Sequence, residues 1–314
     1  MNRRHFFFGC FAFAAGCQQN RRFARNQVTT VRAPSYSIDL TALIRRILIQ
    51  HRVTVKHQRI LLKPNLVEFS SSAPINTHPV LVASVVEAFR SLGASQVRIA
   101  EGPGHRRMTW DMAAAAGFFQ SIAGFERLFT DLNVDDLARV RLASHFSSLT
   151  ELYLPQTVFD CDLLVSLPKM KTHHWTGATL SLKNMFGVVP GSVYGWPKNI
   201  LHWAGIDECI ADLHFLFPRQ FSIVDGIEAM EGNGPILGTR KLAGLIVAGA
   251  HAPTVDATCC RIMQIDPHKV KYLQLIAQRD LTWSIDSSEQ IGEPVHSVQT
   301  RFTLHPDLER LRLN

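Results

Sequence analysis

The stretch Arg59-Ile60-Leu61-Leu62-Lys63-Pro64-Asn65 indicates how the chain folds. Its apolar run has the length of a buried strand, and Pro64 stops it. Thr77-His78-Pro79 then opens a helix, because proline is favoured in the first helical turn, and Gly93 is a typical stop signal at the far end. A strand, a polar loop and a helix in this order predict one unit of an α/β fold.

The same alternation of short apolar runs and helical patterns continues to the end of the chain. Further strands are predicted over 96–100, 162–167, 221–224 and 242–248, and further helices over 109–117, 253–263 and 267–278. This pattern predicts an α/β fold with a mainly parallel sheet and helices on both faces. The segment 169–218 is expected to be an irregular excursion, and residues 39–314 a single domain.

The composition excludes several classes of protein. Of the 314 residues, 46% are hydrophobic and 19% are charged, which supplies a core and excludes a disordered chain. With 19 Gly and 15 Pro the chain is not collagen-like, and its 6 Cys are too few for a small disulfide-stapled scaffold.

The net charge of +7 is concentrated at the N-terminus. Before Asp39 there is no acidic residue and no Lys, but there are six Arg, at positions 3, 4, 21, 22, 25 and 32. Without them the 33 basic residues become 27, against 26 acidic ones, so the rest of the chain carries +1. Because the body is nearly neutral, nucleic acid is not an expected partner.

The first 17 residues resemble a lipoprotein signal with a twin-arginine motif. Arg3 and Arg4 precede an apolar run that is too short to span a bilayer, and Ala14-Ala15-Gly16-Cys17 resembles a lipidation site. We therefore expect a signal over 1–17, a basic tether over 18–38, export to the periplasmic side, and membrane anchoring through a lipid on Cys17. An ordinary signal peptide, or a plain apolar N-terminus, remains the alternative.

The cysteines indicate neither a metal cluster nor a certain disulfide. No C-x-x-C motif occurs, so the chain encodes no iron–sulfur motif of the ferredoxin type and no zinc ribbon. Cys259 and Cys260 lie in an apolar helical pattern and are expected to be buried thiols. A disulfide between Cys161 and Cys209 stays open, because spacing alone cannot establish it.

Polar and charged side chains follow the predicted strands. In a parallel sheet these loops emerge at one edge, where α/β proteins bind ligands, so we expect one shared site there. Lysines at such an edge favour a small anionic ligand. The predicted ligand-binding residues are Lys63, Asn65, Lys169, Lys171, Lys183 and Asn184, and the predicted catalytic residues are Glu101, His173 and Asp225.

The cofactor stays open at this stage. A divalent metal is one alternative, with Glu231 and Asp256 as candidate ligands, although no metal-ligand spacing such as H-E-x-x-H occurs. The chain has no G-x-G-x-x-G, P-loop or G-x-S-x-G motif, which disfavours a Rossmann or P-loop nucleotide site and a serine hydrolase. Each of these residues taken alone could equally be a solvated loop residue, a helix cap or an ion-pair partner.

The ordered motifs resemble those of the domain-of-unknown-function family 362. The motifs are Leu62 to Leu66, Glu101 to Gly104, Leu167 to His173, Leu182 to Asn184, Asp225 to Pro235, and Val255-Asp256. The resemblance extends over roughly residues 60–277 and implies an α/β domain, which in that family sometimes lies beside ferredoxin-like iron–sulfur segments. It implies no particular reaction.

A shorter resemblance concerns the segment Gly104-His105-Arg106-Arg107-Met108-Thr109. It is similar to a G-x-H-R-P-M-T loop of the lactate-racemase family, whose His shuttles a proton beside a nickel-pincer cofactor, but Arg107 stands in place of the Pro. Three functions therefore stay open: an enzyme using acid–base, metal or cofactor chemistry, a non-catalytic ligand-binding lipoprotein, and a cofactor-dependent isomerase of the racemase kind.

Overall fold

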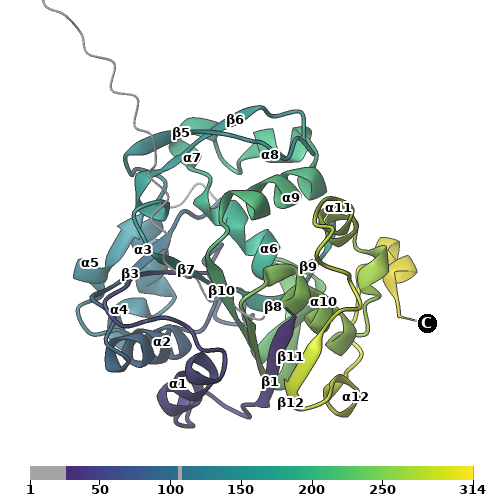
Figure 1. The fold of residues 1–314 in the computed structure, drawn as a ribbon, viewed down its shortest axis with the longest axis horizontal. Helices are drawn as coiled ribbons and strands as arrows, with labels where there is room; N and C mark the ends of the chain where they lie inside the picture. The colour runs from purple at the N-terminus through teal and green to yellow at the C-terminus, as the bar shows by residue number, and fades with distance from the viewer. Residues whose placement is uncertain (1–25, 105–107, 314) are drawn as a thin grey trace, which may run out of the picture.

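The computed structural model describes residues 26–104 and 108–313 (Figure 1). The strands are β1 (Gln27–Arg32), β2 (Arg59–Pro64), β3 (Gln96–Glu101), β4 (Phe129–Asp131), β5 (Leu137–Arg141), β6 (Glu151–Pro155), β7 (Leu163–Leu167), β8 (Lys169–His173), β9 (Gly177–Thr179), β10 (Gln220–Asn233), β11 (Leu237–Gly249) and β12 (Glu289–Gly292). The helices are α1 (Leu40–Gln50), α2 (Pro79–Ser91), α3 (Thr109–Ala115), α4 (Phe118–Ser121), α5 (Phe125–Leu128), α6 (Ser181–Asn184), α7 (Gly191–Tyr194), α8 (Asn199–Trp203), α9 (Ile206–Leu216), α10 (Ala252–Ile262), α11 (Lys271–Arg279) and α12 (Val295–Val298). The 3₁₀ segment η2 (Met185–Val188) directly follows α6.

Within the described residues, ten strands form one sheet. Its order is β12-β1-β11-β10-β7-β2-β3-β4, with β8 paired to β10 and β9 paired to β8. The strands from β4 to β10 in this order are parallel, whereas β11 is antiparallel to both of its neighbours. The predicted α/β fold with a mainly parallel sheet is confirmed, and the ends of β2 and β3 lie at one edge of it.

Alternate residues of the central strands enter two cores on opposite faces of the sheet. In β2, Ile60 and Leu62 pack in the core that contains α1 and α2, whereas Leu61 packs in the core that contains α9, α10 and α11. Figure 1 shows these two groups of helices on either side of the sheet. A strand that is buried on both faces is apolar at consecutive positions, which explains the run from which the fold was predicted.

The segment 169–218 is more regular than the sequence predicted. Its first residues form β8, which pairs with β10, and β9 and four helices follow. β8 was missed because it carries Lys, Thr and His where a buried strand normally carries apolar residues, although all five of its residues are buried. The strands predicted over 221–224 and 242–248 are parts of longer strands, β10 and β11, that form an antiparallel hairpin.

The folded body begins before residue 39. The predicted signal over 1–17 and most of the tether over 18–38 lie outside the described residues or in a loop, but residues 27–32 form β1. β1 pairs with β11 on one side and with β12 on the other, so this part of the predicted tether belongs to the sheet. In the described part of the chain, no helix is both long and apolar enough to cross a membrane.

A buried polar cluster attaches the segment before α1 to the sheet. Lys169 Nζ donates to Asp225 Oδ2 at 2.6 Å and to the Tyr36 hydroxyl at 2.9 Å, and that hydroxyl donates to Asp225 Oδ1 at 2.8 Å. The His78 amide donates to Asp225 Oδ2 at 2.9 Å, and the His78 and Tyr36 rings stack at 3.7 Å. Burial, with the charge of Asp225 as the second cause, raises the pKa of Tyr36. Each charge in this cluster has several partners, as a buried charge requires.

The cysteines within the described residues are free thiols. Cys209, Cys259 and Cys260 are buried and Cys161 is partly buried, and none of them forms a disulfide. Burial raises the pKa of Cys161 and of Cys209 to about 11, so both thiols stay protonated at neutral pH. The pairing between Cys161 and Cys209 that the sequence left open does not occur.

Replacement of Thr30 by Pro tests whether β1 belongs to the folded body. Thr30 is fully buried between Val247 of β11 and Gly292 of β12. Thr30→Pro removes a backbone donor from the sheet and leaves a buried acceptor unpaired, so it is expected to lower the free energy of unfolding by about 1–3 kcal/mol. Thr30→Val is the matched control. The Thr30 hydroxyl has no partner within the described residues, so its loss is expected to be neutral or stabilising. Urea denaturation measures both free energies of unfolding, and equal stability of the two variants would contradict the assignment.

Candidate functional site

A cavity of about 640 Å³ opens at the edge of the sheet where β2 and β3 end. Its lining comes from the loops after these strands, from β8 and β9, from α6 with η2, from the segment around α8, and from the turn between β10 and β11. The sequence-predicted residues that line it are Lys63, Asn65, Glu101, Lys171, His173, Lys183 and Asn184.

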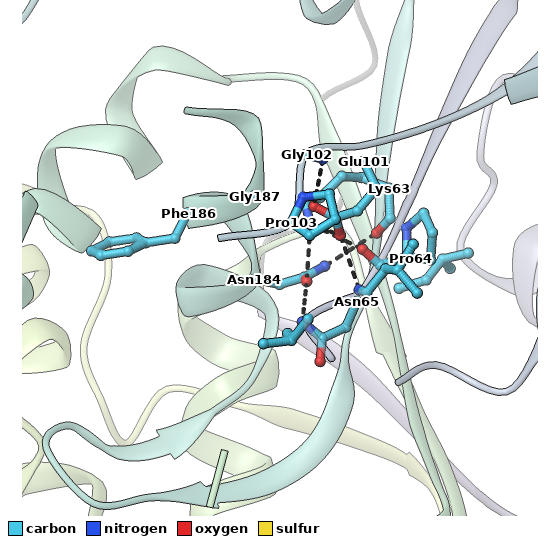
Figure 2. Close-up of polar contacts among 12 residues, drawn as sticks. Lys63, Pro64, Asn65, Glu101, Gly102, Pro103, Asn184, Phe186 and Gly187 are labelled. Carbon is cyan, nitrogen blue, oxygen red and sulfur yellow. Dashed lines mark hydrogen bonds and ion pairs between the residues drawn. The ribbon is translucent and has the colours of Figure 1, made fainter. Parts of the chain in front are cut away.

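A buried ion pair joins the ends of β2 and β3. Lys63 Nζ contacts Glu101 Oε2 and also donates to Pro64 O at 2.9 Å (Figure 2). The backbone amides of Leu66 and Gly102 donate to the two Glu101 oxygens at 3.1 and 2.9 Å. Burial lowers the pKa of Lys63, and the Glu101 carboxylate opposes this change. Both Glu101 oxygens are thus occupied by donors from the protein itself.

The Asn184 side chain fixes α6 against the strand ends. Its Nδ2 donates to Lys63 O at 3.1 Å and to Ser166 Oγ at 3.0 Å, while its Oδ1 accepts from Lys63 Nζ and from Asn65 Nδ2, each at 3.2 Å. Figure 2 shows Asn184 between Lys63 and Asn65, with the Phe186 ring directed away from them. The predicted role of Asn184 in ligand binding is untested, and its contacts are those of a positioning residue.

Asp256 holds the other end of α6. Its two carboxylate oxygens accept from the amides of Ser181 and Leu182 at 2.8 and 3.0 Å. Burial raises the pKa of Asp256 to about 7, which the two amide donors oppose. Asp256 therefore positions the helix that carries Lys183 and Asn184 and does not line the cavity.

Two glycines allow the main chain to approach the ion pair. A Cβ atom on Gly102 would lie 2.8 Å from the Gly187 carbonyl oxygen, and a Cβ atom on Gly187 would overlap Glu101 and Lys63. Only a residue without a side chain fits at either position. The η2 segment therefore packs directly against the ion pair, and its residues Phe186 and Gly187 form one wall of the cavity.

Lys171 and Lys198 bring further buried amines to the cavity. Lys171 Nζ donates to Ile75 O at 2.8 Å and to Pro235 O at 3.2 Å. Lys198 Nζ donates to three carbonyl oxygens, Gly102 O, Phe186 O at 3.1 Å and Gly187 O at 3.4 Å. Burial lowers the pKa of Lys171 well below its usual range, and burial lowers that of Lys198 to about 7. Both amines contact neutral carbonyl oxygens, so an anion in the cavity would provide the counter-charge that they lack.

Lys183 differs from the other lysines of the cavity. Within the described residues its Nζ has no hydrogen-bond acceptor, and it lies 3.7 Å from the centroid of the Phe186 ring. Burial, with the charge of Lys63 as the second cause, lowers the pKa of Lys183 to about 7. Both the neutral and the protonated form of this amine are therefore accessible near neutral pH.

Histidines also line the cavity. The His173 Nδ1 accepts from the amides of Trp175 and Thr176 at 3.1 and 3.4 Å, so the proton of the neutral ring lies on Nε2. Burial and the charge of Lys183 lower the pKa of His173 well below its usual range. His202 packs edge-on against Trp175 at 5.1 Å, and burial lowers its pKa as well. These rings are neutral donors and acceptors at pH 7.

Two buried polar atoms of the lining have no hydrogen-bond partner within the described residues. They are Asn65 Oδ1 and Thr179 Oγ1. Buried polar groups are nearly always hydrogen-bonded, so each of these two atoms is available to a water or to a bound molecule. Apolar residues form the rim, among them Trp175, Trp203 and Leu237, which are 59%, 82% and 77% exposed.

The remaining predicted site residues lie elsewhere. Lys169 and Asp225 belong to the buried cluster with Tyr36, and Glu231 pairs with Lys241 at 3.3 Å and accepts from the Thr303 amide. None of them lines the cavity. Among the residues that the structure describes, no group of three or more His, Cys, Asp or Glu is arranged to hold a metal ion.

The sequence analysis missed Lys198 and His202 as lining residues. Neither follows a strand, so the rule that selected the other residues does not apply to them. Their only signal was a Lys and a His within a segment rich in Trp, Gly and Pro. The residues 105–107, which carry the similarity to the lactate-racemase loop, lie outside the described residues, although the adjacent Gly104 lines the cavity.

Two solved structures match this chain with low similarity. A protein from Thermotoga maritima matches with a TM-score of 0.40 and 14% identity, over 73% of this chain and 59% of its own. The lactate racemase apoprotein from Thermoanaerobacterium thermosaccharolyticum matches with a TM-score of 0.45 and 10% identity, over 76% of this chain and 57% of its own. We draw no functional conclusion from either.

Comparison of sequences identifies the family. The thylakoid-associated protein sll1697 of Synechocystis sp. is 29% identical over 218 residues, which are 67% of this chain and 64% of that protein, so the chain spans less than two thirds of that relative's length. A family model described as a domain of unknown function, DUF362, matches residues 60–261. The match begins in β2, ends in α10 and includes every lining residue of the cavity named above. This chain therefore belongs to the DUF362 family.

Proposed function

We propose that the protein is an enzyme that binds a small organic anion in this cavity and carries out acid–base chemistry on it. The observation that supports the proposal is the gathering of Lys171, Lys183 and Lys198 around one cavity. Among the described lining residues Glu101 is the one acidic side chain, and it is already paired with Lys63. The remaining amines therefore favour a ligand that carries negative charge.

The rim and the unpartnered atoms indicate which further chemical groups the ligand carries. Exposed Trp and Leu side chains at the opening favour an apolar or planar portion. Asn65 Oδ1 accepts a hydrogen bond, and Thr179 Oγ1 donates or accepts one. A carboxylate or phosphate joined to a hydroxyl-bearing or planar organic group matches these features.

The amines also supply proton transfer. Lys183 has a pKa of about 7, so at neutral pH it is populated both as a base and as an acid, which suits general acid–base catalysis. His173, which the sequence analysis proposed as a proton carrier, presents a neutral ring with its proton on Nε2. A non-catalytic binding protein would use the same cavity, and turnover of a bound anion distinguishes the two functions.

Lys183→Met tests anion binding. Because Lys183 donates to no carbonyl of the described chain, its replacement leaves no buried acceptor unpaired. The loss of one charge-assisted hydrogen bond is expected to weaken binding of lactate and inorganic phosphate by about 10- to 100-fold. Isothermal titration calorimetry measures both affinities. Lys56→Met, at an exposed site away from the cavity, is the control and is expected to bind as the wild type. Unchanged affinity in Lys183→Met, or the absence of binding in the wild type, would contradict the proposal.

Lactate binding is expected to weaken as the pH rises from about 6 to about 9. Lys183 and Lys198 both have a pKa of about 7 in the free protein, and a bound anion raises it because it stabilises the ammonium forms. Complex formation above pH 7 therefore takes up protons. Calorimetry in buffers of different ionisation enthalpy measures the number of protons taken up on binding. This number is expected to be smaller for Lys183→Met than for the wild type. An affinity that is constant over this range would exclude the role of the two amines.

We also propose that the chain is exported to the periplasmic side and anchored there. The support is the sequence of residues 1–17, with its paired arginines and its Ala-Ala-Gly-Cys segment, which lies outside the described residues. Arg3→Lys/Arg4→Lys is expected to leave the full-length precursor in the cytoplasm, and Cys17→Ala to prevent lipid labelling. Cell fractionation with radiolabelled palmitate detects both, and normal export of the double variant would refute the twin-arginine route.

A further inference from the structure

Lys183 occupies a distinct chemical environment in the cavity. Lys63 Nζ contacts a carboxylate, and Lys171 and Lys198 donate to backbone carbonyl oxygens. Lys183 Nζ has no such acceptor within the described residues and faces the ring of Phe186 at 3.7 Å. No group in the described residues donates a hydrogen bond to this nitrogen either, so its lone pair is free when the amine is neutral, and a pKa of about 7 makes the neutral form accessible near pH 7.

The backbone that carries Lys183 is fixed at both ends. Asp256 accepts from the first amides of α6, and Asn184, the next residue after Lys183, is bonded to β2 and β7. A nucleophile on a rigid support can be positioned against a bound molecule, as nucleophilic catalysis requires.

Lys183 also lies close to the other groups that surround the cavity. Its charge is among the causes that lower the pKa values of Lys171, Lys198, His173 and His202. Lys171, Lys183 and Lys198 also line the same cavity, so a small anion bound there is exposed to all three amines. The Lys183 side chain ends in an amine, and a neutral amine can react with a carbonyl carbon.

We propose that Lys183 forms a Schiff base with a small anionic carbonyl compound, either a 2-oxo acid or an aldehyde phosphate. The proposal rests on the proposed function, because the same amines hold the anionic group. Both compound classes share a carbonyl carbon within a few bonds of the negative charge. Lys171 and Lys198 bind that charge, and Lys183 attacks the carbonyl.

The reaction needs no further reagent. The neutral Nζ of Lys183 forms a bond to the carbonyl carbon, and the carbonyl π bond breaks toward oxygen. Two hydrogens of the amine pass to that oxygen, which leaves as water, and a carbon–nitrogen double bond remains. The imine nitrogen then takes one proton from solvent. The resulting iminium ion withdraws electrons from the adjacent carbon, so a proton on that carbon becomes acidic.

Reductive trapping tests this inference. The full chain is incubated with pyruvate or with glycolaldehyde phosphate in the presence of sodium cyanoborohydride, and the adduct is located by intact-mass and peptide mass spectrometry. We expect one reduced adduct, on Lys183, with at least one of the two carbonyl compounds. The trapping rate should rise through about pH 7 and then level off, whereas an exposed lysine with a pKa of about 10.4 would react faster up to much higher pH.

Two variants separate this inference from the proposed function. Lys183→Arg lacks a nucleophilic amine, so it is expected to form no adduct at position 183, while lactate binding is measured on the wild type. Lys56→Arg, at an exposed site, is expected to be trapped like the wild type.

The outcomes are distinct. If the wild type binds lactate and phosphate but forms no adduct with either carbonyl compound, the Schiff base is excluded and the anion site stands. If Lys183→Arg is labelled as strongly as the wild type, the nucleophile is another lysine and the inference is wrong. If the wild type binds neither anion and forms no adduct, the proposed function and the inference fail together.

Discussion

The ion pair between Lys63 and Glu101 is the contact on which the candidate site depends. It joins the ends of two neighbouring parallel strands, and both side chains are about 1% exposed. Removing two charges from water is costly, and the cost is offset only when each charge has further partners. Here the backbone amides of Leu66 and Gly102 and the side chain of Asn184 provide them. Loss of either charge would leave the other buried alone, at a cost of about 3–5 kcal/mol.

The same ion pair affects the protonation of the other amines of the cavity. Because Glu101 is committed to Lys63, it does not neutralise Lys171, Lys183 or Lys198. These amines are buried without a carboxylate partner, and the pKa values of Lys183 and Lys198 fall to about 7. If an anion binds here as we propose, its charge favours the ammonium forms, so binding is linked to the uptake of protons.

Much of the fold could be predicted from the sequence, because strands buried on both faces and helices with proline and glycine at their ends leave local patterns. The residues after β2 and β3 were found by the rule that parallel strands end at one edge. The rule failed for Lys169 and Asp225, which lie within strands and pair with each other. The rule also could not predict Lys198, because this residue does not follow a strand. Its position depends on how the segment around α8 packs over the sheet. Glu231 and Asp256 were selected by residue type alone, and their partners are backbone amides and a lysine.

The position of β1 has a consequence for how the chain reaches its final structure. Thr30 lies beside Val247 on one side and Gly292 on the other, so the first strand of the body has both of its neighbours near the far end of the chain. During synthesis this strand has no partner until almost the whole sequence has left the ribosome. Contacts between such distant residues form slowly, and until they form, the edges of β11 and β12 are open to other chains. Pairing of β1 with β11 and β12 therefore covers edges that would otherwise be exposed.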